Sequence, residues 1–157
     1  MDRRKFLKIT GLGLGSAAVL GWGLNRFGII RRKNRMDKNE NIVIEFISCW
    51  SELNAEKLAE FFTEDGIYHN MPMEPVQGRE KVKQFIAGFM QSWTSTTWEL
   101  LSIVSHGDIV IAERLDRTQA GEKSVDLPCV GIFHMEGGKI KSWRDYFDSK
   151  TYFDAMS

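Results

Sequence analysis

The chain has 157 residues, enough for one domain of ordinary size, and its 21 basic residues balance its 21 acidic residues. The charges are unevenly placed: residues 1–36 carry nine Lys or Arg and one acidic residue, which leaves 12 basic and 20 acidic residues for the remainder. Because an acidic domain is poorly suited to a polyanion, nucleic acid is excluded as the expected partner.

Residues 1–36 have the features of an export signal. Arg3 and Arg4 are followed by Phe-Leu-Lys and then by an apolar, glycine-rich run at residues 9–24, a pattern that resembles a bacterial twin-arginine signal. The run is short and interrupted by glycines, so it is a weak membrane span, and a plain N-terminal anchor remains the alternative. We therefore expect residues 37–157 to form the folded domain, exported by the twin-arginine machinery to a periplasmic or other extracytoplasmic site.

Three segments in the first part of this domain are expected to be helices. The first begins with a capping box at Asp37 and Glu40, the second follows Asn54, and the third follows Gly78. The third has apolar residues at the i, i+3, i+4, i+7 spacing of a helix with one face in a core. These apolar residues are Val82, Phe85, Ile86, Phe89, Met90 and Trp93.

Most of the remaining chain is expected to form strands. A turn at residues 64–66 precedes a short strand at 67–71, and the proline-containing stretch after it is expected to be irregular. Four further strands are expected at 98–105, 109–117, 124–135 and 140–147, before a short helix capped by Asp148. Helices followed by an antiparallel meander predict an α+β fold, with helices on the concave side of a curved sheet.

Polar side chains in three of these strands are placed to face one interior. Side chains two apart on a strand point to the same face, so Tyr68 lies beside Asn70 and Arg114 beside Asp116. Asp145 lies between two aromatic residues on its strand, where an unpaired carboxylate is costly. Two carboxylates, one guanidinium and two water-binding groups together indicate acid–base catalysis.

Structural interpretations of the first two pairs remain open from these residues alone. Arg114 and Asp116 are also compatible with a surface ion pair on an edge strand. Tyr68 and Asn70 are also compatible with side chains that satisfy backbone groups near a turn. No His, Cys and acidic residues occur at ligand spacing, so no metal site is predicted.

Taken together, the fragments resemble the limonene-1,2-epoxide hydrolase family. The resemblance rests on residues 64–78 (EDGIYHNMPMEPVQG), 113–116 (ERLD) and 138–148 (GKIKSWRDYFD), and it covers residues 38–154. It implies a cone-shaped fold built on a curved, mixed sheet, shared with nuclear transport factor two, ketosteroid isomerases and SnoaL-like cyclases. It also implies a homodimer and an enzyme that uses neither a metal nor an organic cofactor.

The same resemblance implies a one-step hydration of an epoxide to a vicinal diol. Asp145 would be the general base that deprotonates a water held by Tyr68 and Asn70. Asp116 would be the general acid that protonates the epoxide oxygen, with Arg114 between the two carboxylates. One guanidinium, one ionised Asp and one protonated Asp sum to zero charge, which lowers the penalty of burying them.

The expected substrate is a small apolar epoxide of the terpenoid, aryl or steroid type. Several residues of the expected pocket wall are bulky aromatics, so limonene oxide itself is not singled out. The wall is expected to consist of Ile47, Trp50, Phe89, Trp93, Leu127, Cys129 and Phe147. Cys49 and Cys129 are expected to be buried free thiols, although a disulfide is compatible with the sequence.

Two other functions are compatible with the same fragments. The first is an isomerase or cyclase in which Asp145 removes a carbon-bound proton, and the second is a non-catalytic module that binds a small apolar ligand. An Arg between two acids favours the hydrolase, because a proton-abstracting isomerase needs an oxyanion donor beside its base instead.

Overall fold

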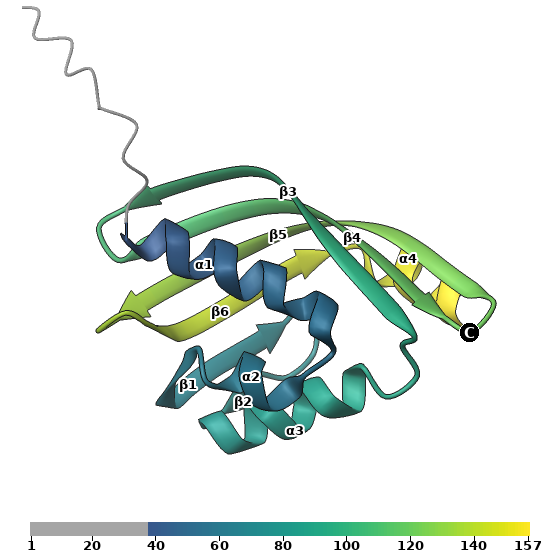
Figure 1. The fold of residues 1–157 in the computed structure, drawn as a ribbon, viewed down its shortest axis with the longest axis horizontal. Helices are drawn as coiled ribbons and strands as arrows, with labels where there is room; N and C mark the ends of the chain where they lie inside the picture. The colour runs from purple at the N-terminus through teal and green to yellow at the C-terminus, as the bar shows by residue number, and fades with distance from the viewer. Residues whose placement is uncertain (1–37) are drawn as a thin grey trace, which may run out of the picture. The chain divides into compact units, whose positions relative to one another are not determined.

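The computed structural model describes residues 38–157, and their fold is built on one six-stranded sheet in the order β2-β1-β6-β5-β4-β3 (Figure 1). Four consecutive strands form the predicted antiparallel meander: β3 (Ser95–His106), β4 (Ile109–Ala120), β5 (Lys123–Glu136) and β6 (Lys139–Phe147). β1 (Phe62–Asn70) pairs parallel to β6 and antiparallel to the short β2 (Val76–Gln77). The predicted α+β class with a mixed sheet is confirmed.

The helices pack against this sheet (Figure 1). They are α1 (Lys38–Cys49), the 3₁₀ turn η1 (Trp50–Glu52), α2 (Ala55–Ala59), α3 (Arg79–Phe89) and α4 (Ser149–Met156). α1 contacts β3 and β4, α3 contacts β1, and α4 contacts β5. Buried and exposed side chains alternate along β4 and β5, so the inner face supplies the core and the outer face is open.

The expected turn at residues 64–66 is wrong, because β1 continues through it with a bulge between Phe62 and Ile67. Acidic residues followed by Gly are common in turns, and the same residues suit a bulge. A Cβ on Gly66 would lie 3.0 Å from both the Phe62 Cβ and the Thr63 carbonyl oxygen, so a side chain there would crowd the bulge. β2 likewise falls in the stretch that was expected to be irregular.

Other expectations have mixed outcomes. Asn54 and Asp148 cap α2 and α4 as predicted, and both cysteines are free and buried. α3 ends at Phe89, so Met90 and Trp93 lie beyond the helix that was expected to contain them. The proposed export signal and the Asp37 cap lie outside the described residues. Within residues 38–157, every helix is too short or too polar to cross a membrane.

Candidate active site

Arg114 lies at the centre of a buried ionic row on the inner face of β4. Its Nε and Nη2 donate to the Asp116 carboxylate at 3.1 and 3.0 Å, and Nη2 also donates to both Asp145 oxygens at 3.0 and 2.9 Å. β4 lies between β3 and β5, and Arg114 is fully buried. The alternative of a surface pair on an edge strand is therefore wrong.

A glycine on the intervening strand lets Arg114 reach Asp145. Asp145 comes from β6, and its partner across β5 is Gly131. A Cβ at Gly131 would lie 2.7 Å from Arg114 Nη1 and 2.9 Å from Trp143 Nε1, so any side chain there would displace the guanidinium. Arg114 also lies over two aromatic rings, 4.5 Å from the Trp98 centroid and 5.7 Å from that of Trp143. The surrounding rings and carboxylates thus fix one position for the cation.

Burial shifts the pKa values of Asp145 and Arg114 in this row. Removal from water raises the pKa of Asp145, and the charge and hydrogen bonds of Arg114 offset only part of that rise. Burial alone would lower the pKa of Arg114, but the two carboxylates outweigh it and raise the pKa above its usual value. The guanidinium therefore stays charged, while Asp145 becomes a stronger base than an exposed aspartate.

Tyr68 and Asn70 reach the same site from β1. The parallel pairing of β1 with β6 places Tyr68 beside Trp143 and Asn70 beside Asp145, and the Tyr68 and Trp143 rings stack at 4.2 Å. Both polar atoms of the buried Asn70 amide lack a hydrogen-bond partner among residues 38–157. The alternative interpretation, in which the Asn70 side chain satisfies backbone groups near a turn, is therefore wrong. A buried unpaired amide costs about 1–3 kcal/mol, which indicates a group that holds a water or a ligand.

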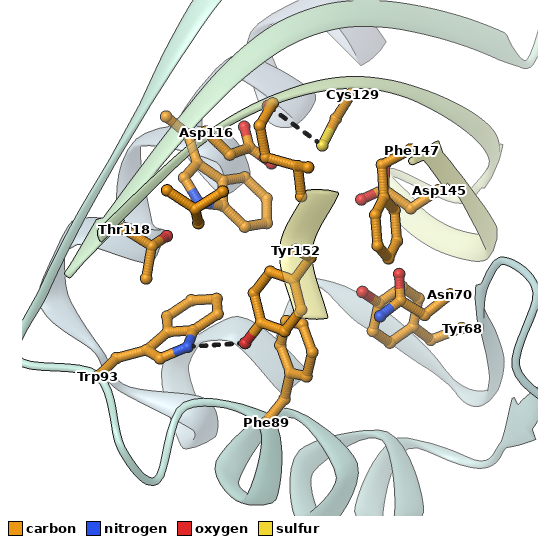
Figure 2. Close-up of a pocket in the computed structure, with 13 residues that line it drawn as sticks. Tyr68, Asn70, Phe89, Trp93, Asp116, Thr118, Cys129, Asp145, Phe147 and Tyr152 are labelled. Atoms are coloured by element: carbon orange, nitrogen blue, oxygen red, sulfur yellow. Dashed lines mark hydrogen bonds between the residues drawn. The ribbon is translucent and has the colours of Figure 1, made fainter. Parts of the chain in front are cut away.

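These side chains line a narrow cavity, which together with the adjoining open solvent makes about 350 Å³ of empty space (Figure 2). Figure 2 shows Tyr68, Asn70 and Asp145 together on one side of the cavity, with Asp116 and Thr118 toward the other. The lining residues are Tyr68, Asn70, Phe89, Trp93, Trp98, Asp116, Thr118, Val125, Leu127, Cys129, Asp145, Phe147 and Tyr152.

The lining includes most, but not all, of the expected wall. Ile47 and Trp50 are absent from it, because both are buried in the core and Trp50 stacks on Trp98 with ring centroids 4.0 Å apart. Phe89, Trp93, Leu127, Cys129 and Phe147 do line the cavity.

Four lining residues were missed by the sequence analysis: Trp98, Thr118, Val125 and Tyr152. Period-two spacing from Asp116 and Leu127 could have identified Thr118 and Val125. Tyr152 has no such signal, because it enters from α4.

The site fits a metal cation poorly. Ligand atoms of Asp116, Cys129 and Asp145 lie within 4.8 Å of one another, which is close enough for a common ion. However, Arg114 already occupies both carboxylates. Burial and the neighbouring carboxylates raise the pKa of the Cys129 thiol, so it stays protonated and is no thiolate ligand.

Comparison with known proteins assigns the chain to a family. Residues 43–143 match the SnoaL-like domain family. The chain is 27% identical over 110 residues to a Mycobacterium tuberculosis protein named epoxide hydrolase EphG, an alignment that covers 66% of this chain and 73% of that protein.

Several solved structures share this fold. An LEH-like epoxide hydrolase from M. tuberculosis superposes with a TM-score of 0.66 and 23% identity, over 75% of this chain and 88% of that one. An NTF2-like protein from Burkholderia pseudomallei gives a TM-score of 0.71 and 15% identity, over 78% and 99% of the two chains. A protein with a ketosteroid isomerase-like fold from Catenulispora acidiphila gives 0.67 and 20%, over 73% and 90%. At these identities the likeness concerns the fold alone.

Proposed function

This chain belongs to the SnoaL-like domain family, and from that premise we propose that it is a cofactor-independent epoxide hydrolase. It would add water to an apolar epoxide and release a vicinal diol. The observation that carries the proposal is the buried Asp116–Arg114–Asp145 row, which lies beside the unpaired Asn70 amide. The distant likeness to a protein named as an epoxide hydrolase supports the same reaction.

The proposed chemistry is a concerted general acid–base reaction. Tyr68 and Asn70 hold the water, and Asp145 takes one of its protons as the water oxygen attacks an epoxide carbon. The C–O bond at that carbon breaks, and Asp116 gives its proton to the epoxide oxygen. Asp145 ends the turnover protonated and Asp116 ionised, so one proton must pass back to Asp116 before the next cycle. Arg114 remains charged throughout.

An isomerase or cyclase is the competing function on this fold. Its base would remove a proton from carbon, and its substrate would need a hydrogen-bond donor for the oxyanion that forms. In this cavity the polar group paired with Asp145 is Arg114, which also holds a second carboxylate. That arrangement supports proton delivery to an oxygen rather than enolate stabilisation.

The proposal is tested with the purified full-length chain, a chelator, and a panel of terpene, aryl and steroid epoxides. Formation of a vicinal diol from at least one of them is expected. Loss of activity in the chelator, restored by Zn²⁺ or Mn²⁺, would contradict a metal-free reaction. Deuterium uptake at carbon from heavy water, without diol, would support an isomerase instead.

A single turnover in ¹⁸O water, with enzyme in excess, separates direct attack by water from attack by a carboxylate. Direct attack puts the label in the diol and none in the protein. A carboxylate nucleophile would form an ester, and its hydrolysis would leave the label in the peptide that carries Asp116 or Asp145. An unlabelled diol from the first turnover would therefore reject the role proposed for Asp145.

A further inference from the structure

The cavity carries a second set of polar groups besides the carboxylates, Tyr68 and Asn70. Trp93 Nε1 donates to the Tyr152 hydroxyl oxygen at 3.2 Å, which joins the turn after α3 to α4 (Figure 2). The Tyr152 oxygen accepts this bond, so its own proton remains to be donated. No acceptor for that proton is found among residues 38–157. Burial raises the pKa of Tyr152, so the hydroxyl keeps its proton and acts as a donor toward the cavity.

Thr118 supplies an acceptor to the same cavity. Its hydroxyl lies 2.8 Å from the Thr96 hydroxyl. The Thr96 hydroxyl also accepts from Trp98 Nε1 at 3.1 Å and donates to the Arg117 carbonyl at 3.1 Å. A hydroxyl has one proton and two acceptor positions, so all three contacts of Thr96 are hydrogen bonds only if Thr118 is the donor between the two threonines. The Thr118 proton is then committed, and its oxygen can only accept from a ligand.

From this pair of groups we propose that the cavity binds a substrate that carries a neutral hydroxyl at the end away from its epoxide. A ligand hydroxyl offers both an acceptor for the Tyr152 proton and a proton for the Thr118 oxygen, whereas an ether offers only the acceptor and a hydrocarbon offers neither. A carboxylate is disfavoured, because the charged residues of the lining are Asp116 and Asp145, both acidic. The inference rests on the proposed hydrolase function, since it names the class of epoxide.

The test compares epoxides of cyclohexene that carry, on a one- to three-carbon arm, a terminal hydroxyl, its methyl ether, a methyl group or a carboxylate. At the best arm length, the alcohol should exceed the methyl compound in kcat/KM by about tenfold, the value of one hydrogen bond of about 1.4 kcal/mol. Equal or better turnover of the methyl compound at every length would overturn the inference while leaving the hydrolase intact.

Two variants assign the donor and the acceptor separately. Tyr152→Phe should lower kcat/KM about tenfold for the alcohol and the ether, and leave the methyl compound nearly unchanged. Thr118→Val should affect the alcohol but not the ether, because the ether has no proton to donate. Thr97→Val, at an exposed position of β3 outside the cavity lining, is the matched control for the threonine change and should change nothing. Equal losses for all three substrates in Tyr152→Phe would indicate a purely structural role and reject the inference.

Failure of the hydrolase proposal would leave the binding test in place. If no epoxide is turned over, cyclohexylmethanol and its methyl ether can be titrated while the indole N–H signals are followed by NMR. Tighter binding of the alcohol in the wild type, lost in Thr118→Val, would support the subsite without the reaction. Indistinguishable affinities for the two compounds would overturn it.

Discussion

Asp145 is the residue on which the proposed reaction depends most directly. It is buried, it is held by one Arg114 nitrogen through both oxygens, and it lies beside Asn70. Asp145→Asn keeps the shape of the side chain and removes the base, so the rate of diol formation should fall about 10²–10⁴-fold with little change in melting temperature. Asp126→Asn, an exposed acid on β5, is the control and should retain full activity. A rate for Asp145→Asn above roughly a tenth of wild type would rule out the base role.

The pH profile follows from the same residue. Burial places the pKa of Asp145 above the usual value of 3.8 for an aspartate, and only the ionised form accepts a proton from water. Activity should therefore be present above this raised pKa and be lost as pH falls through it, at a higher pH than an exposed aspartate would give. The measurement is kcat/KM against pH on a substrate that is stable in acid. An acid limb at or below the usual aspartate value would contradict a desolvated base.

At the scale of elements, the local sequence pattern predicted the strand faces and helix caps, which depend on residues close together in the sequence. Period-two alternation placed Arg114 beside Asp116 on an inner strand face, and short polar side chains identified the caps at Asn54 and Asp148. The parallel pairing that brings Asn70 beside Asp145 joins strands more than 70 residues apart, and no local signal encodes it. Tyr152 reaches the cavity only because α4 packs on β5, which is also a long-range contact.

The β5 backbone at Gly131 leaves no room for a side chain beside the Arg114 guanidinium. Gly131→Ala would place a Cβ 2.7 Å from Arg114 Nη1 and move the cation away from the carboxylates. We expect a loss of about 1–3 kcal/mol in the free energy of unfolding. We also expect the rate to fall about 10²-fold, because moving a catalytic group by about 1 Å can lower a rate by that factor. Gly88→Ala on α3 is the control: no atom lies within 4 Å of its added Cβ, so stability should hold or rise slightly. A fully active Gly131→Ala would show that the guanidinium position is not critical.

At the scale of the whole molecule, we propose that residues 1–36 direct the chain to its destination. The paired arginines lead us to propose twin-arginine export of the folded domain. A reporter fused after residue 36 should leave the cytoplasm with the natural signal and stay inside when Arg3 and Arg4 are both replaced by Lys. Export that is unaffected by the double replacement would indicate a different route.

The outer face of β4, β5 and β6 is exposed to solvent. Large apolar side chains are exposed there, in particular Ile111 on β4, Val130 on β5 and Tyr146 on β6, and the register pairs Val130 with Tyr146. Monomeric proteins rarely expose large contiguous apolar patches, and neighbouring strands place these side chains next to one another, so we propose that a second copy of the chain covers this face in a homodimer. Val130→Glu would bury a charge in that interface and should shift the protein to a monomer, as measured by size-exclusion chromatography with light scattering. Phe153→Glu makes an equally drastic change on the exposed side of α4 and should leave the dimer intact. A wild-type protein that is monomeric at micromolar concentration would reject the proposal and leave the apolar outer face without an occupant.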